Sequence, residues 1–248
     1  MIIIGDIGNT NTKICLLNQK YKILKKLILP TIKINHSYLK KKLSFLFKKK
    51  IVINNSLFCS VVPHKFLIIK LFVRAKFKSK CFELKNLNLQ KLIKIKVNKE
   101  QVGSDRLANS IAVASNKNYI ILDFGTATTF DVVIKNIYKG GVIAPGVNIS
   151  LNSLTKKATL IPNINLKKTK KVIGKNTFSA VRSGFFWGYI GLINNIIELI
   201  SKETKKSFEI IITGGFSKLF KNSLKSKVVI DEDITLKGLI KLAKYFKF

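Results

Sequence analysis

Two matching segments lie about half the chain apart, and this internal repeat constrains the fold more than any other feature. Residues 2–13 read IIIGDIGNTNTK, and residues 120–131 read IILDFGTATTFD. Each is an apolar strand that ends in Asp, followed by x-Gly, by small hydroxyl or amide residues, and by a return strand. The alignment pairs Asp6 with Asp123, Gly8 with Gly125, Asn9 with Thr126, and Thr12 with Thr129. The repeat predicts two related domains, which we assign to residues 1–116 and 117–248.

The first of these loops has the composition of a phosphate-binding turn. A glycine in a hairpin turn leaves backbone N–H groups able to point at phosphate oxygens, and Asn and Thr side chains add donors. Lys13 can neutralise charge on the β- and γ-phosphates, and Asp6 at the strand end is placed to hold Mg²⁺ or its water shell. An ordinary polar hairpin is the alternative, which the second copy makes less favourable. The chain has neither GxxxxGK[ST] nor GxGxxG, so P-loop and Rossmann folds lose support.

A second candidate segment, Gly103-Ser104-Asp105-Arg106, lies where a strand pattern gives way to a helical one. We expect Ser104 to cap the helix and Asp105 to lie at its N-terminus beside Arg106, where both surroundings keep a carboxylate ionised. Such an Asp can accept the proton of an attacking hydroxyl, and it need not be a strong base in phosphoryl transfer. The alternative is a helix-capping Asp with a local salt bridge.

Glycines in the second half have two interpretations. Thr213-Gly214-Gly215 follows a strand pattern, and its glycines permit close approach to an adenine or ribose. The segment GGVIAPG at 140–146 would shape a pocket in the same way. A tight turn explains either segment equally well.

The hydrophobic pattern predicts the same order of elements in both halves: three strands, a helix, a strand and a helix. The expected strands are 2–6, 12–18, 21–29, 56–62, 80–84, 91–97, 119–124, 128–135, 137–143, 208–213 and 227–231. The expected helices are 36–50, 64–76, 104–115, 148–157, 176–202 and 235–246, and a mobile loop is expected at 158–172. This order is typical of layered α/β domains.

The charge of the chain has an unusual origin. The formal net charge is +34, but Arg74, Arg106 and Arg182 are the only arginines, so the basic residues are nearly all lysine. Arginine is the preferred residue for base-edge and bidentate phosphate recognition. Together with heavy use of Asn, Ile and Phe, the pattern favours drift toward AT-rich codons, and we expect no specific nucleic-acid partner. A functional basic surface that binds polyanions is the less favoured alternative.

Composition also predicts the compartment. A content of 47% hydrophobic residues excludes global disorder, and no uncharged stretch reads as a membrane span or a secretion signal. Cys15, Cys59 and Cys81 form no CxxC pair, and with only His36 and His64 a zinc site is not expected. These features predict a cytoplasmic protein without a membrane partner.

Taken together, the motifs resemble those of the type III pantothenate kinases, which phosphorylate pantothenate with ATP in the first step of coenzyme A biosynthesis. The resemblance spans the chain and keeps the motif order: DIGNTNTK (6–13), GSDR (103–106), DFGTATTFD (123–131), GGVIAPG (140–146), GKNTFSAVRSG (174–184) and TGG (213–215). It implies two actin-like (ribonuclease H-like) α/β domains from an internal duplication, with the nucleotide in the cleft between them. The internal repeat agrees with this architecture.

The resemblance also implies roles for individual residues. The ATP-binding residues would be Asp6, Ile7, Gly8, Asn9, Thr10, Asn11, Thr12, Lys13 and Thr126. Gly103, Ser104, Asp105, Arg106 and Thr177 would bind pantothenate, with Asp105 as the general base. Asp123 would hold a monovalent cation, K⁺ or NH₄⁺. A Mg²⁺ ion would be bound at a separate position.

Family members are typically homodimers, and the apolar segment with Phe185, Phe186, Trp187 and Ile190 is the candidate interface. An internal core helix is the equal alternative for that segment. The chain departs from the family where relatives usually have a tyrosine followed by Asn-Pro, because residues 96–99 read Lys-Val-Asn-Lys.

A regulatory protein is the competing hypothesis. A nucleotide-binding transcription accessory protein would bind its partner without turnover. It would have no need of Asp105, Arg106 and Lys13 together, and these residues therefore favour the kinase.

Overall fold

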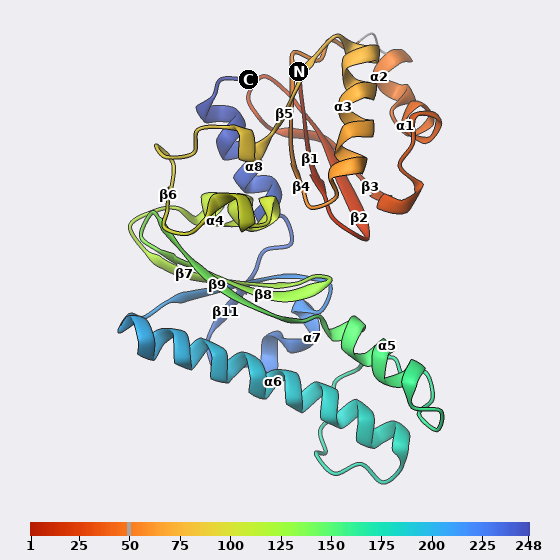
Figure 1. The fold of residues 1–248 in the computed structure, drawn as a ribbon, viewed down its shortest axis with the longest axis vertical. Coiled ribbons are helices and arrows are strands. Elements are labelled where there is room, and N and C mark those ends of the chain that lie inside the picture. Colours follow the sequence, from red (N-terminus) through yellow and green to blue (C-terminus); the bar gives the residue numbers. More distant parts are fainter. Residues whose placement is uncertain (49–50) are drawn as a thin grey trace. The chain divides into compact units, whose positions relative to one another are not determined.

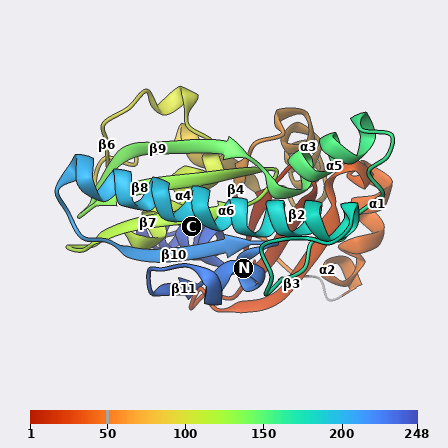
Figure 2. The same ribbon diagram turned by 90° about the horizontal axis from the view of Figure 1, so that it is seen from below.

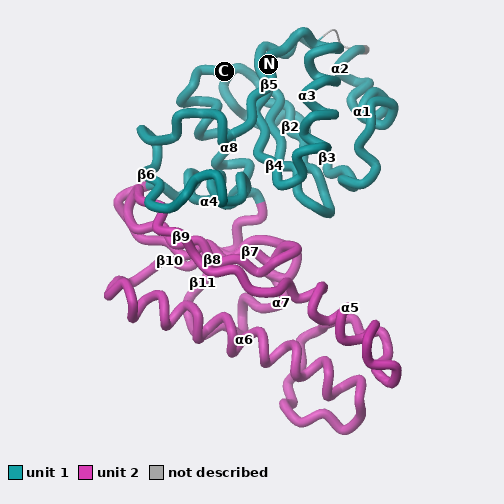
Figure 3. Tube along the Cα trace, in the orientation of Figure 1, with its two compact units in different colours: residues 1–114, 233–248 teal, residues 115–232 magenta. Residues whose placement is uncertain are grey.

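The computed structural model describes residues 1–48 and 51–248, which form two compact units (Figure 1). Unit 1 contains residues 1–114 and 233–248, and unit 2 contains residues 115–232, as coloured in Figure 3. The division after Ala114 lies close to the expected boundary at residue 116. The closing segment, in contrast, belongs to unit 1 rather than to the second half of the chain.

Unit 1 is built on a five-stranded sheet. Its strands are β1 (Ile2–Ile7), β2 (Asn11–Leu17), β3 (Ile23–Pro30), β4 (Asn55–Ser60) and β5 (Lys80–Glu83), in the order β3-β2-β1-β4-β5. The first three strands form an antiparallel meander, and β4 and β5 extend the sheet in parallel with β1. A turn joins β2 to β3, and Asn18 Oδ1 closes it by accepting hydrogen bonds from the backbone N–H groups of Lys20 and Lys22, each at 2.9 Å.

Short helices cover one face of this sheet in Figure 1: α1 (His36–Lys42), α2 (Ser44–Lys48) and α3 (Pro63–Phe77). The predicted helix 36–50 is therefore interrupted, because Leu43 leaves helical geometry at φ −100° and ψ 13°. Residues 49 and 50 of that prediction lie outside the described residues. Leu43, Phe58 and Phe72 belong to the core that the sheet and these helices share.

The remainder of unit 1 leads to its two last helices. After β5 come η2 (Leu84–Asn86), β6 (Lys94–Ile95) and η3 (Lys99–Gln101), then α4 (Ser104–Val113), and the chain ends in α8 (Ile234–Tyr245). Of the strand expected at 91–97, only the two residues of β6 have strand structure. Helices α4 and α8 pack very closely, because a Cβ atom on Gly238 would lie 1.9 Å from the Ala108 carbonyl oxygen. Thr235 Oγ1 also donates to Asn109 Oδ1 at 2.8 Å. These contacts explain why the closing helix belongs to unit 1.

Unit 2 repeats the sheet of unit 1. Its strands β7 (Asn118–Phe124), β8 (Ala127–Ile134), β9 (Ile137–Pro145), β10 (Glu209–Gly214) and β11 (Val228–Ile230) run in the order β11-β10-β7-β8-β9. Again three antiparallel strands are extended by two parallel ones. The predicted internal duplication is therefore visible strand by strand. The short elements are η1 (Thr31–Lys33) in unit 1 and α7 (Ser217–Phe220) and η4 (Lys221–Ser223) in unit 2.

The two hairpin loops differ by one residue. Strand register pairs Ile7 with Thr12 in the first hairpin and Phe124 with Thr128 in the second. Thr128, not Thr129, is thus the structural counterpart of Thr12, and both are fully buried. The sequence alignment failed here because a loop can lose one residue without disturbing the strands beside it.

Helices α5 (Val147–Lys157) and α6 (Thr177–Thr204) complete unit 2, and α6 lies along the sheet in Figure 2. One side of α6 joins the core through Phe186, Ile190, Ile193 and Ile197. The predicted helix 176–202 is confirmed, and residues 158–172 contain no helix or strand beyond a turn, as expected for a loop. Within the described residues, no helix has both the length and the apolar character needed to cross a membrane.

Candidate active site

The loop between β1 and β2 is held by hydrogen bonds from outside the hairpin. The Gly8 N–H donates to the Asn11 carbonyl at 3.1 Å, which closes the turn. Thr31 makes two further hydrogen bonds to the loop. Its N–H donates to the Thr10 carbonyl at 2.9 Å, and its Oγ1 donates to the Gly8 carbonyl at 2.7 Å. Sequence reasoning missed Thr31, whose only signal is its position directly after the edge strand β3.

The residues expected to bind ATP divide into two groups in this loop. Asn9, Thr10 and Asn11 are exposed, and Gly8 and Lys13 are partly exposed, so their polar groups can reach a ligand. The side chains of Ile7 and Thr12 are fully buried. The Thr12 hydroxyl lies 2.9 Å from the Thr31 hydroxyl, so it supports the loop from below.

Asp6, at the end of β1, occupies an apolar and acidic environment. It faces Lys13 across the β1–β2 pair and Cys59 across the β1–β4 pair. The Cys59 thiol donates a hydrogen bond to Asp6 Oδ1 at 3.6 Å. Burial, followed by repulsion from Asp105, raises the pKa of Asp6 to about 6, although Lys13 and the Cys59 hydrogen bond act in the opposite direction.

The segment 103–106 forms the beginning of α4. Gly103 is the N-cap residue and Ser104 is the first helical residue, so the expected capping role of Ser104 is wrong. Its hydroxyl is fully buried and donates to Glu83 Oε1, because the helix meets the end of β5 at this point. Arg106, in the first turn, is partly exposed.

Asp105 lies in the same turn of α4, and its carboxylate lies over Gly103. The Arg106 N–H donates to Asp105 Oδ1 at 2.8 Å, and a Cβ atom on Gly103 would come within 2.5 Å of the same oxygen. The pKa of Asp105 is raised by burial, which outweighs the lowering effects of Arg106 and Lys85. The sequence-based expectation that its surroundings favour ionisation was therefore incomplete, because burial cannot be read from neighbouring residues.

Asp6 and Asp105 come together within unit 1 although ninety-nine positions separate them in the chain, because α4 packs against β4, the strand beside β1. Within the described part of the chain, no group of three or more His, Cys, Asp or Glu side chains could hold a metal by itself. A Mg²⁺ ion usually takes one or two carboxylates and completes its shell with waters and substrate phosphates. Asp6 fits such a site without further protein ligands.

The corresponding loop in unit 2 is lined by glycines. Gly214 has φ +86°, and a Cβ atom there would lie 2.7 Å from Asp123 Oδ1 and 2.5 Å from the Phe124 carbonyl oxygen. A Cβ atom on Gly146 would lie 2.0 Å from the Thr126 carbonyl oxygen. Asp123 is partly exposed and Thr126 is exposed, and the lack of a Cβ atom at Gly214 and Gly146 lets the backbone approach both residues closely.

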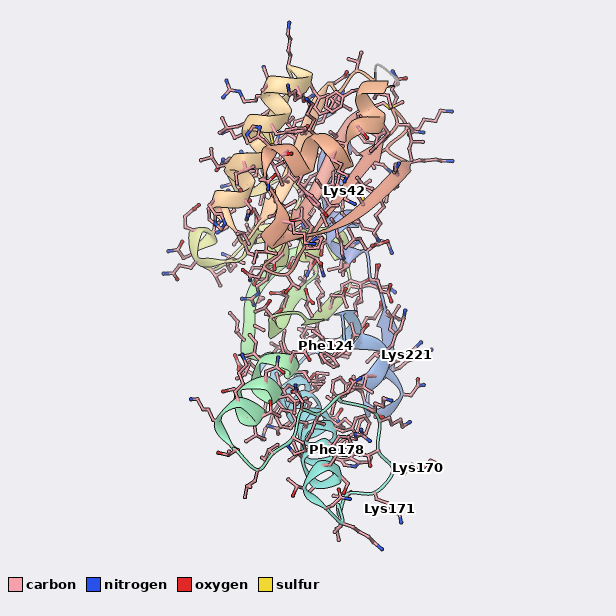
Figure 4. All side chains as sticks on the ribbon, turned by 90° about the vertical axis from the view of Figure 1, so that its right-hand side faces the viewer. Lys42, Phe124, Lys170, Lys171, Phe178 and Lys221 are labelled. Atoms are coloured by element: carbon pink, nitrogen blue, oxygen red, sulfur yellow. The ribbon has the colours of Figure 1, made fainter. Side chains whose placement is uncertain are left out.

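Thr177 is the first residue of α6, and it is exposed. Asn176 caps the helix, with its side chain accepting from the Ser179 N–H at 2.9 Å. Figure 4 labels Phe178 in this first turn, and Lys170 and Lys171 on the connection before it. The Arg182 guanidinium lies 4.3 Å from the Phe178 ring centroid, so the exposed start of α6 carries both a hydroxyl and a cationic group.

Comparison with solved structures identifies the fold. A protein described as a 2-dehydro-3-deoxygalactonokinase from Sinorhizobium meliloti matches with a TM-score of 0.66 at 11% identity, covering 100% of this chain and 98% of that one. A protein described as a Baf family transcriptional activator from Campylobacter jejuni matches with a TM-score of 0.64 at 18% identity, covering 99% and 98%. The duplicated sheets and these matches define an actin-like protein of the sugar-kinase fold class.

Comparison with known sequences identifies the family. The family model for type III pantothenate kinase matches residues 2–199. A protein of Pelagibacter ubique (strain HTCC1062) named type III pantothenate kinase is 66% identical over 248 residues, which is 100% of both chains. The chain belongs to the type III pantothenate kinase family. The predicted resemblance and the kinase class are thereby confirmed, and the regulatory alternative is not favoured.

The raised pKa of Asp6 predicts that this residue destabilises the protein when no ligand is bound. The pKa is about 6 in the folded protein and 3.8 as the ordinary value. Between those pH values the folded state binds more protons than the unfolded state, so the free energy of unfolding falls as pH rises. A difference of this size corresponds to about 3 kcal/mol at most. We expect Asp6→Asn to stabilise the ligand-free protein by about 1–3 kcal/mol at pH 8 and by little at pH 4.

Denaturant unfolding at both pH values measures this effect. Glu198→Gln is the matched control, because Glu198 is an exposed residue on α6 and its loss changes the net charge equally. Equal effects of the two substitutions at pH 8 would show that Asp6 carries no burial penalty.

Proposed function

We propose that this chain transfers the γ-phosphoryl group of ATP to the hydroxyl group of pantothenate, with Asp105 as the general base. The observation that carries the proposal is the placement of Asp6 and Asp105 in unit 1, where β1 pairs with β4 and the helix that carries Asp105 packs against β4. A phosphate bound at the Asp6 loop and a hydroxyl bound at Asp105 would then meet. Phosphoryl transfer depends mainly on such positioning and on charge stabilisation.

In this proposal the first loop binds the phosphates of ATP. The exposed residues Asn9, Thr10 and Asn11 and the N–H groups of the turn supply donors, and Lys13 supplies positive charge. The buried side chains of Ile7 and Thr12 support the loop, so these residues would contact ATP only through the main chain. Asp6 would hold Mg²⁺, which neutralises phosphate charge when bound. Thr126, in the second loop, would also contact the nucleotide.

The pantothenate site would use the beginning of α4. Gly103 leaves room for the Asp105 carboxylate, and the Arg106 guanidinium offers donors to the substrate. The raised pKa of Asp105 makes its ionised form a better proton acceptor than an exposed Asp. Ser104, whose hydroxyl is buried against Glu83, would take part through its backbone.

We expect Asp105→Asn to lower turnover by about 10²-fold or more, as loss of a general base does, while ATP binding stays nearly unchanged. The amide keeps an oxygen for the Arg106 N–H, so the local fold is retained. ADP release with and without pantothenate measures turnover, and a nucleotide titration measures binding. Glu100→Gln, at an exposed residue just before the segment, is the control. Full turnover in the Asp105 variant would remove Asp105 from this role.

Asp123 is proposed to hold a monovalent cation, K⁺ or NH₄⁺. Its carboxylate is partly exposed at the end of β7, and a carboxylate oxygen is the kind of ligand that a hard cation takes. When bound, the cation supplies positive charge at this loop.

We expect replacement of K⁺ by Na⁺ to lower activity, and Asp123→Asn to remove the difference between the two salts. Initial rates at constant ionic strength measure this. Glu209→Gln, an exposed acidic residue of unit 2, should keep the response to K⁺. Equal rates in both salts for the unchanged enzyme would count against the cation site.

We also propose a homodimer formed through the outer side of α6. Phe186 and Ile190, part of the expected interface, are buried in the core of unit 2, so the interface cannot use them. The outer side instead carries Gly184, Gly188 and Gly191, and a Cβ atom added to any of the three would have open space around it, with no neighbouring atom within 4 Å. A glycine inside a helix lowers the stability of the helix by about 0.5–1 kcal/mol relative to alanine. We infer that the three glycines are kept because they let the same helix of a second copy approach closely.

Sedimentation measures the predicted dimer. We expect Gly188→Leu to shift the protein toward the monomer, because the larger side chain would hold a second helix away. Gly188→Ala, which adds one methyl group, should remain dimeric. A monomer at micromolar concentration for the unchanged chain would refute the proposal.

A further inference from the structure

A side-chain pair joins the beginning of α4 to the sheet. Its N-cap residue, Gly103, has no side chain to accept the first helical N–H groups. Instead the buried hydroxyl of Ser104 donates to Glu83 Oε1, at the end of β5. This bond spans 21 residues of sequence, so it joins the first turn of the helix to the sheet.

Glu83 is itself held in a fixed orientation. Its second oxygen, Oε2, accepts from the Lys85 N–H at 2.6 Å, so both carboxylate oxygens are engaged. Strand register places Glu83 beside Phe58, the residue before Cys59, and its charge contributes to the raised pKa of the Cys59 thiol. The carboxylate therefore lies close to the Asp6–Cys59 hydrogen bond as well as to α4.

The chain that leads into α4 is fastened to the same region. The Lys85 ammonium donates to the Glu100 carbonyl at 2.8 Å. The Lys99 ammonium donates to the carbonyls of Lys85 and Leu87, the latter at 3.2 Å. Residues 83–87 thus support both the approach to α4 and its first turn.

The rest of α4 does not depend on Glu83. Its middle is fixed to α8 by the close approach of Gly238 to Ala108 and by the Thr235–Asn109 hydrogen bond. Its C-terminal end is fixed by the Lys241 ammonium, which donates to the Ala114 carbonyl at 2.8 Å. Loss of the Glu83–Ser104 bond would therefore loosen the first turn and leave the helix folded.

We propose that Glu83 is a positioning residue for catalysis, which acts through Ser104 to hold Asp105 in place. Asp105 follows Ser104 directly, and its carboxylate is oriented by the backbone of this turn through the Arg106 N–H. A general base acts only when its oxygen lies within hydrogen-bond reach of the proton that it accepts. The inference rests on the proposed role of Asp105 as that base.

A double-mutant cycle in steady-state kinetics tests the inference. We expect Glu83→Ala and Ser104→Ala each to lower kcat by about tenfold, with KM for pantothenate changed by less than about twofold. The double variant should be no slower than the slower single variant, because both substitutions break the same bond. Glu83→Gln should keep most of the activity, since its amide oxygen can accept from the Lys85 N–H while its amide N–H donates to the Ser104 hydroxyl.

Two controls separate positioning from loss of stability. Glu100→Ala removes an exposed acidic side chain from the segment before α4 and should leave kcat unchanged. Glu83→Asp keeps the charge but withdraws the oxygens by one methylene, so it should lose activity as Glu83→Ala does, even if the alanine variant folds poorly. Thermal unfolding midpoints of all variants are measured alongside.

Three results would overturn the inference. Full kcat in Glu83→Asp or Glu83→Ala would show that the bond does not matter. Multiplicative losses in the double variant would show that the two residues act separately. A raised KM with unchanged kcat in Ser104→Ala would show that the Ser104 side chain contacts the substrate directly. If Asp105→Asn is also fully active, the proposed function itself fails; if only the Glu83 variants are active, this inference alone fails.

Discussion

Asp6 and Asp105 lie near enough for their negative charges to repel each other, and the fold partly buries both carboxylates. Burial and repulsion each disfavour the ionised form of a carboxylate. The two effects therefore lower the stability of the ligand-free protein at neutral pH. A bound cation and the donors of a substrate would relieve this repulsion. The chemistry of the site thus depends on an electrostatic cost that the rest of unit 1 must offset.

The packing of unit 1 offsets that cost through fixed backbone positions. Strands β1 and β4 bring Asp6 beside Cys59, and the contact of Gly238 with Ala108 fixes the helix that carries Asp105. Close-packed interiors resist movement, because a small displacement already loses many contacts. The closing helix α8 is therefore part of the support for the site, although it is the last element of the chain.

Unit 2 shows what a duplication keeps and what it changes. The strand order is identical in both units, and a buried threonine follows each loop, Thr12 in one and Thr128 in the other. The loops themselves differ, since the lysine at position 13 corresponds in register to Thr129. The positive charge at the first loop and the glycine-lined carboxylate of Asp123 at the second suit different ligands.

Local signals in the sequence were enough to predict most of the strands and helices, the duplication and the family, because hydrophobic periodicity and glycine positions can be read within short segments. They also located the segments around Asp6, Asp105 and Asp123. Long-range packing, in contrast, places α8 in unit 1, brings Thr31 and Glu83 to the support of the site, and raises the pKa of Asp105 through burial. These features arise from contacts between residues far apart in the chain, and neither burial nor such contacts are encoded in any short segment.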